Sequence, residues 1–271
     1  MSLLKNLKKK FKHYDIDGYL VPKNDIFFSE YSKPDKLKEI TGFKGSAGTA
    51  LILKKSNYLI VDGRYVLQAH KESGKNFKII DTTNIKLENF FKKFNNLKIG
   101  YDPKLFTSNY LKNYLTSCRI KPLRDNLINT ITLKKKSKNS KFFYYLKKSI
   151  CGESVISKIN KITNFLKLKG IDNLFISSNE NVCWLLNIRG KDLPNSPVAN
   201  FQAIFSTKNE IFLFGNIKKL RNVKKKRLNK KIKFFEKSEF WKVLNSLKGN
   251  SFCIDNKTCS VLNENLINSK F

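Results

Sequence analysis

Each half of the chain begins with an apolar stripe that has helical spacing. In the first half the stripe comprises Leu4, Leu7 and Phe11, and in the second half it runs from Val155 through Ile159 and Ile162 to Leu166. Lysines occupy most of the other positions. Apolar residues spaced by three and four positions are typical of an amphipathic helix that packs on a core. We therefore predict one surface helix at the start of each half.

A short apolar run follows each predicted helix. The runs are residues 18–21 and 174–176, and turn residues bound both of them. Such runs are typical of buried strands. Gly170 stands where the second helix should end, and Asp15 occupies the equivalent position in the first half.

The next elements also come in the same order in both halves. A helix that ends near Thr41 and a helix through Leu186 are each followed by a loop and two strands. The four strands are predicted at 49–54, 58–62, 201–206 and 210–214. Helices that alternate with strands in this way favour an α/β fold, in which helices flank a mixed sheet.

The sequence itself repeats along with the pattern. IDGYLVPKND at 16–25 matches IDNLFISSNE at 171–180, and Asp102 in IGYDP matches Asp255 in CIDNK. A repeat of about half the chain indicates two tandem domains of one fold. We place them at 1–125 and 153–271. Residues 126–152, with the run KKKSKNSK, are predicted to be a solvated connector.

The net charge of +33 raises the possibility of nucleic-acid binding. Only six of the 54 basic residues are arginine, however, and the lysines are spread along the chain. Arginine is the preferred residue for bidentate phosphate and guanine contacts, so specific nucleic-acid binding is disfavoured. No apolar run is long enough for a membrane span, and five cysteines without a CxxC pair favour a reducing, cytoplasmic location.

Two loops carry the candidate functional residues. Arg64 follows Asp62 in DGRY; Asp62 is a candidate helix N-cap, and Arg64 would either pair with a carboxylate or face a cleft or a partner subunit. Arg189 and Asp192 lie on a glycine-bearing loop that we expect to be exposed, where they would either make contacts or merely pair with each other. The glycines at 42–48 favour a tight loop over a phosphate cradle, and the tryptophans are predicted to be core residues.

Five strings together resemble a known family. They are PKNDIFFSEY at 22–31, TGFKGSAGT at 41–49, DGRYVLQA at 62–69, GES at 152–154 and WLLNIRGKDLPNSP at 184–197. The chain resembles the first two domains of Xaa-Pro aminopeptidases of the creatinase/aminopeptidase P family. The resemblance implies two creatinase N-terminal-like, ribonuclease H-like domains. Phe27 stands where the family usually has His.

In that family a third, pita-bread domain carries the chemistry. It supplies two Asp, one His and two Glu to a dinuclear metal centre, typically manganese. We expect this domain to be absent from the chain, so that the chain has no catalytic residues, metal ligands or cofactor of its own and is inactive alone. Its expected role is the non-catalytic half of such an enzyme, which limits substrate access and aids assembly. The alternative is a stand-alone binding or regulatory module.

The same resemblance suggests what the chain would contact. The expected partners are a catalytic pita-bread domain, a peptide substrate reached through that domain, and further copies of the chain in a homo-oligomer. The loop with Arg189 and Asp192 is expected to lie near the catalytic cleft, beside exposed apolar side chains.

Overall fold

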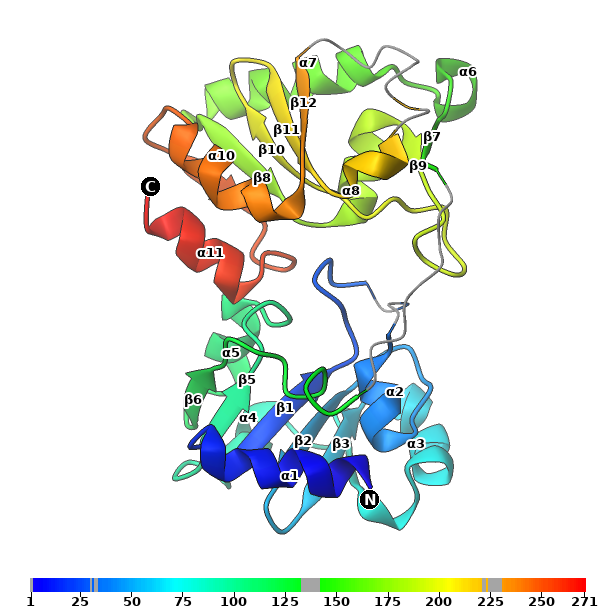
Figure 1. Ribbon diagram of the computed structural model, residues 1–271, viewed down its shortest axis with the longest axis vertical. Coiled ribbons are helices and arrows are strands. Elements are labelled where there is room, and N and C mark those ends of the chain that lie inside the picture. Colours follow the sequence, from blue (N-terminus) through cyan, green and yellow to red (C-terminus); the bar gives the residue numbers. More distant parts are fainter. Residues whose placement is uncertain (1, 30, 32–33, 133–141, 221–222, 224–230) are drawn as a thin grey trace. The chain divides into compact units, whose positions relative to one another are not determined.

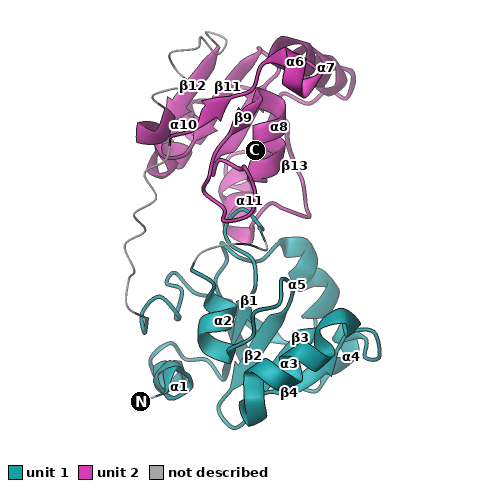
Figure 2. Ribbon diagram, turned by 90° about the vertical axis from the view of Figure 1, so that its right-hand side faces the viewer, with its two compact units in different colours: residues 1–136 teal, residues 137–271 magenta. Residues whose placement is uncertain are grey.

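The computed structural model describes residues 2–29, 31, 34–132, 142–220, 223 and 231–271. The chain divides into two compact units, residues 1–136 and 137–271 (Figure 2). Each unit is built around its own sheet, so the expected pair of tandem α/β domains is present.

Unit 1 opens with helix α1 (Leu3–His13), which buries Leu7 and Phe11 as the apolar stripe predicts. Asp15 then adopts the left-handed conformation with φ of 48°, which turns the chain into strand β1 (Gly18–Pro22). All five residues of β1 are buried, so this strand lies at the centre of the core.

The sheet of unit 1 has six strands in the order β4-β3-β2-β1-β5-β6 (Figure 1). Strand β2 is antiparallel to both of its neighbours, β1 and β3, whereas β4, β5 and β6 each pair in parallel with a neighbour. The remaining elements are α2 (Lys36–Thr41), β2 (Thr49–Leu53), β3 (Asn57–Val61), η1 (Gly63–Tyr65), α3 (Val66–Ser73), η2 (Gly74–Asn76), β4 (Lys78–Asp81), α4 (Leu87–Lys92), β5 (Lys98–Tyr101), α5 (Ser108–Tyr114) and β6 (Arg119–Pro122).

Unit 2 repeats this order. Its sheet runs β12-β11-β10-β8-β13, so β8 is the counterpart of β1 and β13 the counterpart of β5. The elements are β7 (Tyr144–Tyr145), α6 (Lys148–Cys151), α7 (Val155–Leu168), β8 (Asn173–Ile176), α8 (Asn179–Leu186), β9 (Ile188–Arg189), β10 (Gln202–Ser206), β11 (Glu210–Phe214), η3 (Ile217–Leu220), β12 (Ile232–Phe235), η4 (Lys237–Glu239), α10 (Phe240–Ser246), β13 (Phe252–Ile254) and α11 (Val261–Asn268).

The pairing confirms the repeat. Strand β8 is antiparallel to β10 and parallel to β13, as β1 is antiparallel to β2 and parallel to β5. Among the described residues, unit 1 alone has a further strand, β6, which borders β5 at the edge of the sheet.

Helices cover both faces of the sheet in unit 2. Alternate residues of β11 point to opposite sides, so that Ile211 and Leu213 pack with α7 and α8 while Phe212 and Phe214 pack with α10 and α11. Because side chains alternate across a strand, one short sequence supplies both cores.

The predicted connector at 126–152 is wrong at residues 126–128 and at Phe143, which are buried in the two units. Leu127 is 0% and Ile128 1% exposed in the core of unit 1, and the Leu127 backbone N–H donates to the Tyr19 hydroxyl at 3.3 Å. On the other side of the run, Phe143 is buried in unit 2 and Tyr144 pairs with Arg189. The KKKSKNSK run at 134–141 lies outside the described residues. The many lysines of this run make the whole stretch 126–152 look polar. The few apolar residues on either side of the run, which are buried, are therefore easily overlooked in the sequence.

This packing predicts that residue 127 contributes strongly to stability. Leu127→Ala should lower the free energy of unfolding by about 2–5 kcal/mol, because it leaves a cavity in a close-packed core. The matched control is Leu67→Ala, at a side chain that is 86% exposed, and it should change stability by less than about 0.5 kcal/mol. Chemical denaturation measures both; equal effects would mean that the 126–132 segment is not part of the core.

Candidate functional site

Arg64 lies on the short turn η1, which leaves strand β3. The Asp62 carboxylate accepts the Arg64 backbone N–H at 3.0 Å, its Nε at 3.0 Å and its Nη2 at 2.9 Å. The hydrogen bonds from Arg64 lower the pKa of Asp62. Asp62 therefore caps the turn as predicted, and the Arg64 side chain, 75% exposed, is held in a defined direction on the surface of unit 1.

Arg189 lies on the two-residue strand β9, opposite Tyr144. Its Nη1 donates to the carbonyl oxygens of Cys183 at 2.8 Å and Ile188 at 3.0 Å. The side chain is half-buried, and it satisfies a carbonyl group near the end of α8. Tyr144, which pairs with Arg189 across the two strands, is 39% exposed.

Asp192 is held in place by a different set of contacts. Its Oδ1 accepts from Lys219 Nζ at 2.5 Å and its Oδ2 accepts from the Asn200 backbone N–H at 2.9 Å. The Asp192 side chain is only 8% exposed. The expectation of an exposed Arg and Asp is therefore wrong, and so is the alternative of a pair between them. Each residue instead fixes a different part of the 187–200 loop.

Asn187 and Lys158 form the anchor of this loop, which the sequence pattern did not reveal. Asn187 is left-handed, with φ of 51°, and donates from Nδ2 to the Glu153 carbonyl oxygen at 3.0 Å. Lys158 Nζ donates to Asn187 Oδ1 and to the Trp184 carbonyl oxygen, both at 2.7 Å. Lys158 is 2% exposed and burial lowers its pKa. The only sequence signal was a lysine within an apolar helical stripe.

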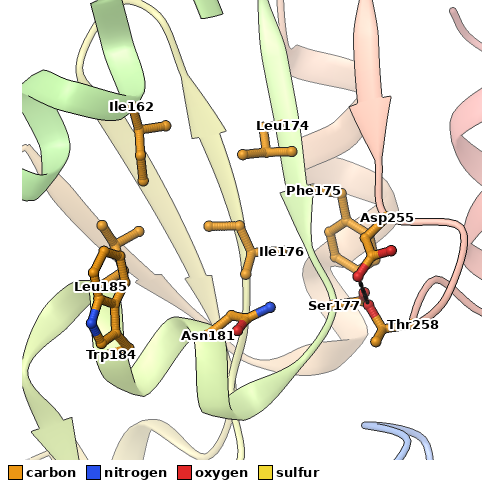
Figure 3. A pocket seen from close by; sticks show the side chains of 10 residues that line it. All are labelled: Ile162, Leu174, Phe175, Ile176, Ser177, Asn181, Trp184, Leu185, Asp255 and Thr258. Carbon is orange, nitrogen blue, oxygen red and sulfur yellow. Dashed lines mark hydrogen bonds between the residues drawn. The ribbon is translucent and has the colours of Figure 1, made fainter. Parts of the chain in front are cut away.

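Trp184 and Trp241 are 54% and 44% exposed, which contradicts the prediction that they are core residues. Trp184 lines a cavity of about 240 Å³ in unit 2 (Figure 3). Its lining residues are Ile162, Leu174, Phe175, Ile176, Ser177, Asn181, Trp184, Leu185, Asp255 and Thr258. Tryptophan is often placed where one face of the ring is buried and another is wet.

The structure also gives the positions of Phe27 and of the histidines. Phe27 is 4% exposed, and its backbone N–H donates to Asp25 Oδ1 at 2.8 Å. The two histidines of the sequence, His13 and His70, lie on α1 and α3. In the described part of the chain no group of three or more His, Cys, Asp or Glu side chains is arranged to hold a metal ion. Within the same residues, no helix is both long enough and apolar enough to span a membrane.

Comparisons with known proteins agree with this architecture. The family model for the creatinase/prolidase N-terminal domain matches residues 4–130, and a second model with the same description matches residues 133–270. The chain resembles the crystal structure of X-prolyl aminopeptidase from Caenorhabditis elegans with a TM-score of 0.81 at 23% identity, covering 90% of this chain and 43% of that one. That protein is described as a cytosolic enzyme with a di-nuclear active site.

Curated relatives give the same result at higher identity. A probable Xaa-Pro aminopeptidase P from Laccaria bicolor is 31% identical over 226 residues, which is 78% of this chain and 35% of the relative. A Xaa-Pro aminopeptidase from Drosophila melanogaster is 30% identical over 226 residues, covering 76% of this chain and 35% of the relative. The chain thus spans about 35% of the length of these relatives. With two matching domain models and relatives of this kind, the chain belongs to the creatinase/prolidase N-terminal domain family, as a tandem pair of the type found in Xaa-Pro aminopeptidases P.

Proposed function

We propose that this chain is the non-catalytic N-terminal part of a Xaa-Pro aminopeptidase. In this proposal its two domains limit the access of peptides to a catalytic domain and help the enzyme to assemble, and the protein works in the cytoplasm. The observation that carries the proposal is the part of the relatives that this chain matches. Two N-terminal domain models account for residues 4–130 and 133–270, yet the matched region is about 35% of the relatives' length.

The chemistry of the described side chains supports the division of labour. A dinuclear manganese centre needs a close group of carboxylates and imidazoles, and the described residues offer no such group. The centre implied by the family therefore does not fit these domains. In our proposal it belongs to a pita-bread domain, and this chain supplies surfaces and not ligands.

Within that role, Arg189 and Asp192 act as positioning residues and Arg64 is a direct contact candidate. The first two are tied to carbonyl groups, a backbone N–H and Lys219, so they keep the 187–200 loop in one conformation. A loop that is fixed by buried polar contacts can present a constant surface to a partner domain or to a second copy in an oligomer. Arg64 is exposed and preset by Asp62, as a contact to a partner carboxylate would require.

A stand-alone binding module is the second candidate function, and the open cavity beside Trp184 favours it. The two functions differ in one outcome. A binding module would have no effect on a peptidase, whereas an access domain changes which peptides the peptidase cleaves.

We predict that the purified chain cleaves no Xaa-Pro peptide, with or without added manganese. Combined with the remaining polypeptide of the Laccaria bicolor relative, produced without its N-terminal third, it should restore cleavage of a short Xaa-Pro peptide and reduce cleavage of a long one. Chromatography of the products measures both, and the catalytic polypeptide alone is the control. Cleavage by the chain alone that a chelator abolishes would contradict the proposal. An unchanged ratio of short to long substrates would contradict the access role.

Substitutions separate the contact residue from the positioning residues. Asp192→Ala should lower the free energy of unfolding by about 2–3 kcal/mol, because it leaves Lys219 without its carboxylate in a largely buried site. Arg64→Ala should change stability by less than about 1 kcal/mol, because an exposed ion pair contributes little. In the combined enzyme, Arg64→Ala should nevertheless lower kcat/KM.

The matched control for Arg64→Ala is Arg124→Ala, at another exposed arginine of unit 1. The control should change neither stability nor kcat/KM. Equal kinetic effects of the two substitutions would remove Arg64 from the list of contact residues.

A further inference from the structure

Helix α1 carries a row of lysines on the face that points away from the core. Residues 3–13 include five lysines and no acidic residue. Lys5, Lys8 and Lys12 are spaced by three and four positions, so they lie within about 60° of one another around the helix axis. We call these three residues the basic row. The row is about 10 Å long, the length over which one strand of a stacked nucleic acid carries three phosphates.

The basic row is fixed in place by the rest of unit 1. Leu7 and Phe11, on the opposite face of α1, are 0% and 1% exposed and pack in the core, which fixes the rotation of the helix about its axis. Lys8 Nζ donates to the Lys54 carbonyl oxygen at 3.2 Å, so the row is also tied to the turn that follows β2. A surface that is already ordered loses little conformational entropy when it binds a partner.

The positive charge of the row is not neutralised by nearby acidic residues. Asp15 pairs with Lys98 and Lys121, and Asp17 pairs with Lys54. In the part of the chain that the structure describes, no carboxylate pairs with a member of the basic row. The three ammonium groups are therefore available to an anionic partner.

An aromatic pair stands at the end of the row. His13 and Tyr14 follow Lys12 directly, with ring centroids 4.9 Å apart and planes at 83°. His13 is exposed, whereas Tyr14 is half-buried against the core and its carbonyl oxygen accepts from Lys121 Nζ at 2.9 Å. The anchored Tyr14 thus supports the exposed imidazole ring. Lysines beside an exposed ring are the combination that binds single-stranded nucleic acid, through phosphate contacts and base stacking.

Two features distinguish a nucleic acid from a membrane surface as the partner. The apolar side chains of α1 are buried in the core, so the helix has none to insert between lipids. The His13 ring, in contrast, offers a face on which a base can stack. Because lysine is a point charge without the planar fork of arginine, the row contacts phosphates without selecting bases.

We propose that the basic row and His13 bind single-stranded nucleic acid without sequence preference. In this interaction Lys5, Lys8 and Lys12 contact successive phosphates of one strand, and His13 stacks on a base. The inference concerns unit 1 alone and stands independently of the proposed function.

The probe is a labelled oligouridine of about 12 nucleotides, mixed with the full 271-residue chain. We expect saturable binding by fluorescence anisotropy at about 0.15 M salt, and weaker binding as salt is raised. Replacing the three lysines of the row by Gln should weaken binding about tenfold or more. It should also make the slope of log K against log salt less negative by about 2, because each phosphate contact to a single strand contributes about 0.7. Replacing the same lysines by Arg should preserve binding, because the charge is kept.

The matched control removes the same charge from the other side of the sheet. Helix α4 packs there, because its Phe90 contacts Tyr58 while the alternate β3 residues Leu59 and Val61 face the core that holds α1. Replacing the exposed Lys86, Lys92 and Lys93 on α4 and its ends by Gln lowers the net charge equally. This variant should change oligouridine affinity by less than about twofold.

Two further variants test the individual contacts. Lys5→Gln with Lys12→Gln spares Lys8 and its contact to the Lys54 carbonyl oxygen, so the fold is not perturbed there. It should change the salt slope by about 1.4, the share of two phosphate contacts. His13→Ala should weaken binding about tenfold with an unchanged slope, because it removes stacking and not charge.

Several outcomes would overturn the proposal. Equal losses in the basic-row and α4 variants would mean that binding follows net charge and does not involve α1. The absence of saturable oligouridine binding at about 0.15 M salt would refute it directly. So would phosphatidylserine vesicles that bind the chain more tightly than oligouridine does and lose that binding in the basic-row variant, because the partner would then be a membrane.

Discussion

Apolar cover on both faces of one central strand is the constraint on which each domain depends. Strand β1 is buried along its whole length, and it joins an antiparallel half of the sheet to a parallel half. Its side chains alternate between two cores, so helices are needed on both sides. In unit 1 the helix α1 and the segment 123–128 together complete one of these faces. Strand β8 occupies the same place in unit 2, but alternate residues of it are only half-buried.

The same constraint explains how the two domains have diverged while the topology has not. Strand order and direction agree from β1 to β5 and from β8 to β13, because those pairings generate the core. The two units differ in the segments outside these strand pairings. Unit 2 has a buried polar anchor, in which Lys158 contacts Asn187, where unit 1 uses a left-handed glycine, Gly42, to end the equivalent helix. A buried lysine that donates to two fixed oxygens specifies one loop conformation, and this is the role of the anchor in holding the 187–200 loop.

Local sequence patterns predict most of the helices and strands. They do not predict contacts between residues that are far apart in the sequence. The apolar stripes located α1 and α7, and Gly170 follows the second helix as predicted. Gly170 and its counterpart Asp15 are both left-handed, with φ of 65° and 48°. The burial of Asp192 is not predictable from local sequence, because its partner, Lys219, lies 27 residues away and no local signal links the two. A tryptophan within an apolar helix is usually well buried, which favours a core position for Trp184, yet its side chain is 54% exposed.

The contacts of the acidic residues also change the interpretation of the large positive net charge. The sequence has 54 basic but only 21 acidic residues. The acidic side chains in the candidate sites all stabilise local structure. Asp62 caps a turn, Asp102 accepts a hydrogen bond from Asn126 Nδ2, and Asp192 holds a loop. Asp255 makes the same turn as Asp102, and its Oδ2 accepts from Thr258 Oγ1 at 3.0 Å, where Asp102 Oδ2 accepts from Asn126. Each of these four acidic groups therefore has a partner within its own unit, and the large positive charge reflects lysines that have no such acidic partners to spare.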